Sequence, residues 1–265
     1  MNLLHIGAVL LLNAGFAWLT GSLLARRWHD PGALRRGEVI ASAVCLSGTL
    51  LAMWAATARM GDLAPLEALL MLPQMLVQTS YGQAGLAATA CAALTLLPWR
   101  GVIVQALLLA LFALARASAS HASEHGWFSV AVGVEWLHLM LIGVWLGGVT
   151  LAGWVALPTG RHLGWLSQVA TWALAGIVAS GVFNAWQRLD APGQLFGTPY
   201  GLVLSVKLAF IALAALLGAY NRFAGFPAAA CGQGRAASLV LRVESVALLA
   251  ALASAALLTS MAPPA

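Results

Sequence analysis

Two histidines, His5 and His138, occupy matching positions in a chain that reads as an internal duplication. His5 lies 42 residues before the pair Ser47-Gly48, and His138 lies 42 residues before the pair Ser180-Gly181. Imidazole is a ligand for transition metals and for haem iron. A polar residue repeated at the same place in two halves of a membrane chain indicates paired sites on a two-fold scaffold.

The same offset of 133 residues relates further parts of the two halves. It places His29 on His162, so that a histidine stands at each end of the first helix in both halves. Each Ser-Gly pair is followed by an aromatic turn, Thr79-Ser80-Tyr81-Gly82 in the first half and Thr198-Pro199-Tyr200-Gly201 in the second. The repeat therefore predicts two homologous half-bundles.

A carboxylate accompanies the histidine of the second half. Glu135 and His138 are three residues apart, so they project from one face of the same helix. A carboxylate in that place can hold an imidazole in one tautomer, as the outer partners of metal-bound histidines do. The first half has Asn2 where the second has Glu135. The alternative is that each histidine only forms a hydrogen bond with a neighbouring helix.

Two more imidazoles precede the helix of His138. His121 and His125 are four residues apart, which is ligand spacing on one helical turn, although such a pair in a solvated loop often has no role. We expect a metal site on the outer side of the membrane, made by His5, His121, His125 and His138.

Methionines favour copper as the metal. By the expected topology all seven lie in outer loops or in the outer thirds of helices: Met1, Met53, Met60, Met71, Met75, Met140 and Met261. Thioether and imidazole together suit copper, and Cu(I) in particular, whereas Mg²⁺ or Ca²⁺ would require carboxylates. Met53, Met140 and Met261 are the expected supporting ligands, with Glu135 behind them. Methionine is also a common filler of apolar helices.

Other polar residues lie deeper or on the inner side. If the protein moves an ion across the membrane, His29 and His162 are candidate ligands at its exit on the inner side. Otherwise we expect them to be solvated loop residues. Lys207 and Glu244 lie inside apolar helices, where an ionisable side chain is energetically costly and therefore indicates a functional role. They lie toward opposite faces of the membrane, so we do not expect them to pair.

Composition requires a lipid environment for these residues. Hydrophobic residues make up 62% of the chain and charged residues 8%, against about 45–50% and about 25% in soluble domains. The basic residues are spread over short loops, which excludes a nucleic-acid surface. At about 20 apolar residues for each crossing, the sequence predicts an all-α polytopic membrane protein with eight helices: 3–24, 37–57, 82–99, 101–117, 129–156, 165–187, 201–221 and 238–260. The Gly- and Ala-rich stretch 222–237 is expected to be a mobile loop.

The arginines predict the orientation of these helices. Most of them fall on one side of the membrane, which the positive-inside rule makes cytoplasmic, so both termini face the periplasm. Each half contains four helices, and the repeat is therefore parallel, with residues 1–117 forming the first half and residues 118–265 the second. The first helix has no basic segment before it and is expected to be a permanent span.

Taken together, these residues resemble the bacterial copper resistance protein D family (CopD/PcoD). The resemblance rests on the following motifs: Glu135-Trp136-Leu137-His138, Trp145-Leu146-Gly147-Gly148, the His121-Ala122 loop, Ser180-Gly181, Thr198-Pro199-Tyr200-Gly201 with Lys207, Asn221-Arg222, and Glu244 followed by a terminal proline. It implies an eight-helix inner-membrane protein of copper uptake or tolerance that works with a periplasmic copper carrier of the CopC type, here a separate chain. The sequence departs from the family pattern in two places, with Ser-His-Ala where Gly-His-Ala is expected and Glu135 in place of Asp.

The leading functional hypothesis is a copper-binding inner-membrane protein that takes copper, as Cu(I) or Cu(II), from the periplasm toward the cytoplasm. It is not expected to be an enzyme, although a redox activity stays open, and it can form a homo-oligomer. The alternative is a b-type haem protein, because His5 and His138 could ligate haem axially. A third reading is an assembly partner that holds no ion of its own.

Overall fold

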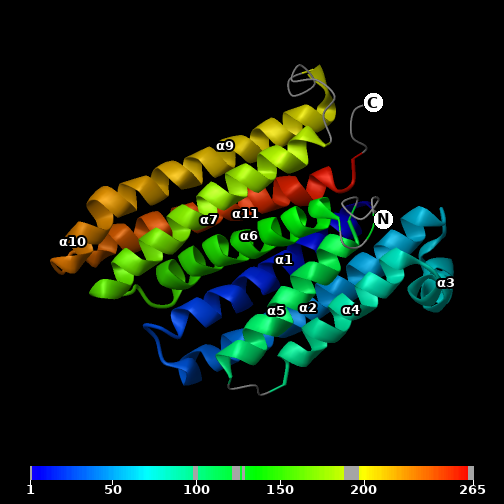
Figure 1. Cartoon of the computed structure of the whole chain (residues 1–265), viewed down its shortest axis with the longest axis horizontal. Coiled ribbons are helices and arrows are strands. Elements are labelled where there is room, and N and C mark those ends of the chain that lie inside the picture. Colours follow the sequence, from blue (N-terminus) through cyan, green and yellow to red (C-terminus); the bar gives the residue numbers. More distant parts are fainter. Residues whose placement is uncertain (1, 98–100, 121–125, 127–128, 188–196, 262–265) are drawn as a thin grey trace. The chain divides into compact units, whose positions relative to one another are not determined.

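The computed structural model describes residues 2–97, 101–120, 126, 129–187 and 197–261. These residues are almost entirely helical, and no β-strand occurs among them (Figure 1). A helix satisfies all of its backbone hydrogen bonds internally, which a segment in lipid requires. The all-helical prediction is therefore confirmed for the described part of the chain.

Six of the described helical runs are long and apolar enough to cross a membrane. They are α1 (Asn2–Ala25), α2 (Pro31–Met60), α6 (Val130–Trp154), α7 (Arg161–Trp186), the continuous run of α9 (Pro199–Tyr220), η2 (Asn221–Gly225) and α10 (Phe226–Ala230), and α11 (Gly234–Leu258). Shorter helices between α2 and α6 are α3 (Pro65–Gln78), α4 (Ser80–Thr95) and α5 (Val102–Ser118). The chain is thus a multi-pass membrane protein by length and composition of its helices.

The two aromatic turns of the internal repeat have the same local structure. The Thr79 hydroxyl accepts a hydrogen bond from the Gly82 amide at 2.9 Å, and the Thr198 hydroxyl accepts one from the Gly201 amide at 3.0 Å. Each threonine is therefore the N-cap of the helix that follows, α4 or α9. The matching motifs in the sequence are matching helix starts in the structure.

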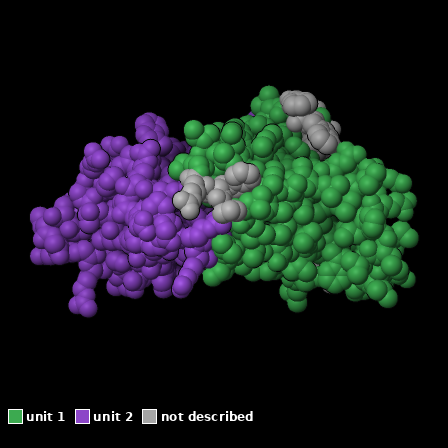
Figure 2. All heavy atoms as spheres, turned by 90° about the horizontal axis from the view of Figure 1, so that it is seen from below, with its two compact units in different colours: residues 1–16, 39–140 green, residues 17–38, 141–265 purple. Residues whose placement is uncertain are grey.

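The described helices form two compact units, coloured separately in Figure 2. Unit 1 consists of residues 1–16 and 39–140, and unit 2 of residues 17–38 and 141–265, so that α1, α2 and α6 contribute to both. These units describe compactness and not duplication. The division into repeats at residues 1–117 and 118–265 stays a prediction.

In unit 1, glycines bring α1 and α2 into backbone contact. A Cβ on Gly48 of α2 would lie 2.5 Å from the Leu12 nitrogen of α1, and a Cβ on Gly15 would lie 2.6 Å from the Ala41 oxygen. Small residues of this kind permit close approach of helices in lipid. The helix α4 packs on both α3 and α5.

In unit 2, α9 and α11 pack along their length, and α7 contacts α9. A buried ion pair joins the residue after the end of α1 to the beginning of α2, with Arg26 Nη2 2.8 Å from Glu38 Oε1. The indole of Trp28 donates to the Ala156 carbonyl at 2.9 Å, which ties the end of α1 to the segment after α6.

The segment 222–237 was predicted to be a loop, and this was wrong, because residues 222–230 and 234–237 are helical. The turn η2 is a π-helix, and the Phe226 amide donates to the Asn221 carbonyl five residues earlier. Pro227 follows directly, and a proline ring in an α-helix collides with the carbonyl four residues before it. The wider π-turn opens the helix at that point, which lets it continue past the proline.

Candidate functional site

The two outer histidines that the sequence pairs both lie in unit 1, in comparable burial. His5 on α1 and His138 on α6 are each 7% exposed. The His5 ring lies beside the backbone of Ala52, and the charge of Arg59 on α2 reaches it. Its Nδ1 atom is buried and has no hydrogen-bond partner among the residues that the structure describes. A buried polar atom without a partner lowers the stability of the fold. This nitrogen is therefore available to coordinate a metal ion or another ligand.

The other two histidines of the expected outer site, His121 and His125, lie outside the described residues. Among the residues that are described, no group of three or more His, Cys, Asp or Glu side chains has the arrangement of a metal centre. The expected outer site therefore stays a prediction, and of its four histidines only His5 and His138 lie among the described residues.

The three supporting methionines lie in different surroundings. Met53 is buried in unit 1, where its sulfur accepts a hydrogen bond from the Thr89 hydroxyl at 3.5 Å and fills the space left by Gly85. Met140 is half-buried at the end of the unit 1 part of α6, two residues after His138. Met261 belongs to unit 2 and follows the end of α11.

Sequence reasoning missed a polar cluster around Arg116, in the last turn of α5. The guanidinium donates a short hydrogen bond to the Asn13 side chain of α1. The charge of Arg116 also acts on Glu135 of α6 and on Tyr81 of α4. Glu135, expected only behind His138, therefore also faces a cation. The signal for this cluster is an arginine that ends an apolar helix on the side of the membrane with few basic residues.

The inner histidines lie in unit 2, and the structure brings their segments together. The Arg27 guanidinium stacks 4.4 Å from the Trp165 ring centroid, and the Trp28 and Trp165 rings are 6.3 Å apart. These contacts join the segment after α1, which carries His29, to the start of α7, which carries His162. Both imidazoles are partly exposed there.

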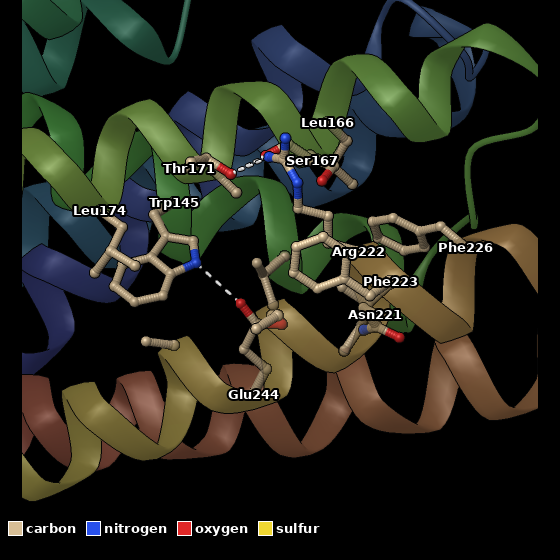
Figure 3. A pocket seen from close by; sticks show the side chains of 16 residues that line it. Trp145, Leu166, Ser167, Thr171, Leu174, Asn221, Arg222, Phe223, Phe226 and Glu244 are labelled. Atoms are coloured by element: carbon tan, nitrogen blue, oxygen red, sulfur yellow. Dashed lines mark hydrogen bonds between the residues drawn. The ribbon is translucent and has the colours of Figure 1, made fainter.

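Unit 2 contains a cavity of about 360 Å³ between α6, α7, α9 and α11, with Glu244 on its wall (Figure 3). Glu244 is 1% exposed. The Trp145 indole nitrogen of α6 donates to its Oε1 atom at 2.9 Å. The absence of a side chain at Gly218 of α9 leaves room for the carboxylate, since a Cβ there would lie 3.2 Å from Oε1. Glu244 was predicted as an intramembrane polar residue, and the structure supplies its partner.

The π-turn η2 forms another part of the cavity wall, with Asn221 and Arg222 (Figure 3). Asn221 is 1% exposed, and its Nδ2 donates to the Ala237 carbonyl at 3.4 Å, while its Oδ1 has no partner in the described part of the chain. The Arg222 guanidinium is exposed and donates to the Thr171 hydroxyl of α7 at 2.6 Å. Single π-turns inside α-helices occur often at functional sites.

The other intramembrane cations of unit 2 do not pair with Glu244. The Nε atom of Arg242 donates to the Gly153 carbonyl at 2.8 Å, and its guanidinium lies over the Trp154 ring at 5.2 Å. Lys207 is half-buried on α9, 11 residues before Gly218. At 1.5 Å for each residue, that separation is about 16 Å along the helix, in accord with the expectation that Lys207 and Glu244 do not meet.

The comparisons with known proteins concern this second unit. Residues 160–258 match the family model described as Copper resistance protein D (CopD). The match begins just before α7 and ends with α11, so it includes Glu244, Asn221 and Arg222, whereas the motifs around Glu135 and Trp145 lie outside it. No curated protein and no solved structure matches the chain. Over its last helices the chain is therefore similar to the copper resistance protein D family, which indicates a membrane protein related to copper resistance.

Proposed function

We propose that the protein binds copper at the periplasmic face of the bacterial inner membrane and moves it toward the cytoplasm. The observation that carries the proposal is the buried, unpartnered Nδ1 of His5 in a chain similar to the copper resistance protein D family. An imidazole nitrogen that lacks a partner in an apolar helix needs a ligand to offset its burial. Copper is the metal that both the family similarity and the donor chemistry favour.

The proposed outer site consists of His5 and His138 from unit 1, together with His121 and His125. Met53 and Met140 of the same unit would supply thioethers, and Glu135 would orient the His138 ring. Met261, also expected as a supporting ligand, belongs to unit 2. His29 and His162, whose segments meet in unit 2, would receive the ion on the inner side. Copper is the cargo here, and the imidazoles are the groups that bind and release it.

The proposed architecture has eight spans. The six long helical runs would be joined by α4 and α5, which pack on each other and are near the lower length limit for a crossing. We propose two parallel four-helix repeats with both termini in the periplasm. A periplasmic carrier of the CopC type would deliver the metal to the outer site, and the bilayer would allow a homo-oligomer.

The proposal is tested by metal analysis of the purified protein beside His5→Ala, His121→Ala and His138→Ala. Each replacement is expected to lower the bound copper, because each removes one of a few ligands. Gln74→Ala is the control, since Gln74 is exposed on α3, has no part in either proposed histidine site and should leave the bound copper unchanged. Equal copper in all of these proteins would overturn the outer site.

The same preparations distinguish the haem alternative. A haem absorption band that disappears in both His5→Ala and His138→Ala would replace the copper proposal, because these two histidines would then be axial ligands. A colourless protein that carries copper supports the transport proposal. Unchanged copper tolerance in cells that express His138→Ala would favour an assembly role.

A further inference from the structure

We propose that the Glu244 carboxyl group is a proton-binding site in the unit 2 cavity, and that its protonation is coupled to copper movement. The coupling rests on the function proposed above, whereas the proton site itself does not. Glu244 is not one of the repeated histidines, so neither the composition nor the internal repeat assigns it a role in proton binding.

Few polar groups surround the Glu244 carboxylate. Glu244 is 1% exposed, and among the described residues the Trp145 indole is its single hydrogen-bond donor. The ion pair found in the described part of the chain joins Arg26 to Glu38 and does not involve Glu244. An ionised carboxylate in a medium of low dielectric is costly unless a cation or several donors accompany it. One indole does not meet that need, and a bound proton does.

The nearest cations do not pair with the Glu244 carboxylate. Arg222 of η2 shares the cavity with Glu244, and its guanidinium is held by the Thr171 hydroxyl. Arg242 is two residues from Glu244 on α11 and binds the Gly153 carbonyl instead. Lys207 of α9 is about 16 Å along its helix from the residue that faces the carboxylate.

The remaining charged groups on the elements around the cavity are remote from Glu244 along their helices. On α11, Arg235 precedes Glu244 by nine residues. On α7, Arg161 and His162 occupy the first turn, before the cavity residues that begin at Leu166. The unit 2 part of α6, residues 141–154, and the helix α10 carry no ionisable side chain. The carboxyl group therefore lacks a fixed counter-ion among the described residues.

The cavity beside Glu244 has room for water. The cavity volume of about 360 Å³ is far more than one water molecule needs. Its wall carries the hydroxyls of Ser167 and Thr171 and the unpartnered Oδ1 of Asn221, which can accept from water. Two of its lining side chains, Arg222 and Phe223, are exposed at the surface of the protein, so the cavity is not sealed on that side. Protons can therefore reach Glu244 through the cavity.

The proton site is tested by infrared difference spectroscopy of the purified protein during a pH titration. We expect the carbonyl stretch of a protonated, buried carboxyl group in the wild type, and its loss in Glu244→Gln. Glu67→Gln is the matched control, because Glu67 is exposed at the start of α3 and should leave the band unchanged. Trp145→Phe keeps the ring and removes the donor, so the band should remain and move in frequency.

Two spectroscopic results would overturn the site. One is a band that is identical in the wild type and in Glu244→Gln. The other is a carboxylate signal that persists at all pH values and responds to Na⁺, K⁺ or copper, because a metal cation would then occupy the place of the proton.

The coupling is tested in proteoliposomes that contain a pH-sensitive dye and are loaded with copper on one side. The wild type should show a pH change that accompanies copper flux, and Glu244→Gln should lose this change while it keeps the same copper per protein. A wild type that moves no copper would refute the transport function and leave the infrared result standing. A copper-linked proton signal that survives in Glu244→Gln would refute the coupling alone.

Discussion

Gly147 of α6 touches Gly21 of α1 through the backbone, and a Cβ on either glycine would overlap the other helix. No side chain separates the two helices at this point. In lipid, such contacts replace the hydrophobic driving force that is missing between helices. The crossing fixes α1 against α6 within unit 2, near the cavity residue Trp145.

Replacement of Gly147 by Ala should destabilise the protein by about 1–3 kcal/mol, the usual cost of an overpacked contact. The added methyl group meets the Ala17 carbonyl, which is backbone and cannot turn away. The measurement is thermal unfolding in detergent. Gly133→Ala is the control, because a Cβ at Gly133 of the same helix meets nothing within 4 Å. Equal melting temperatures for the two variants would show that the helices are not in close contact.

Replacement of Glu38 by Gln should lower the free energy of unfolding more than replacement of both Arg26 and Glu38 by apolar residues does. The side chains of Arg26 and Glu38 are 10% and 4% exposed, and loss of one partner from a buried pair costs about 3–5 kcal/mol because the other charge stays buried. A double-mutant cycle with Arg26→Met and Glu38→Leu measures the coupling. Simple additivity of the two single effects would contradict the pairing.

Replacement of Gly225 by Ala should disturb the π-turn, because the new methyl group would overlap the Asn221 Oδ1 atom. The cost should be about 1–3 kcal/mol, measured by chemical denaturation. The double variant Asn221→Ala with Gly225→Ala should recover part of this loss, since the obstructing amide is gone. A double variant that is less stable than the sum of the single variants predicts would contradict the contact.

Chemical labelling of cysteine tests the proposed orientation. Cys231 is exposed in the turn between α10 and α11, whereas Cys45 is buried in α2. A membrane-impermeant maleimide should label Cys231 in inside-out vesicles and not in intact cells, because that turn is proposed to be cytoplasmic. Cys231→Ser should remove the label. Labelling from the outside would reverse the topology.

The long apolar helices could be predicted closely from the sequence, because each needs little beyond an uninterrupted apolar run. The prediction 129–156 corresponds to α6 at Val130–Trp154. The start of α2 was predicted six residues too late. There Pro31 suits the first turn of a helix, and the Asp30 carboxylate accepts a hydrogen bond from the Ala33 amide at 3.0 Å. Because the helix begins early, it also includes Arg35 and Arg36, which were expected in a loop.

The polar contacts could not be predicted in the same way. Trp145 and Glu244 are 99 residues apart and meet only because α6 packs near α11. The sequence shows that Glu244 stands in an apolar helix, but helical periodicity does not show which neighbour it faces. Similarly, Arg116 reaches Asn13 across 103 residues. The histidine pair was visible because it is repeated, and repetition is a signal that these single contacts lack.

The run from Pro199 to Ala230 contains 32 residues and is therefore about 48 Å long at 1.5 Å for each residue. A hydrocarbon layer is about 30 Å thick, so this rod must tilt or project beyond the lipid. The surplus of about 18 Å corresponds to about 12 residues. If all of it lies at the end of the run, it includes Asn221 and Arg222, which line the cavity. Lipids with longer acyl chains would draw that end into the membrane, and shorter chains would leave it in water. The acyl-chain length of the lipid should therefore set the amount of water in the cavity.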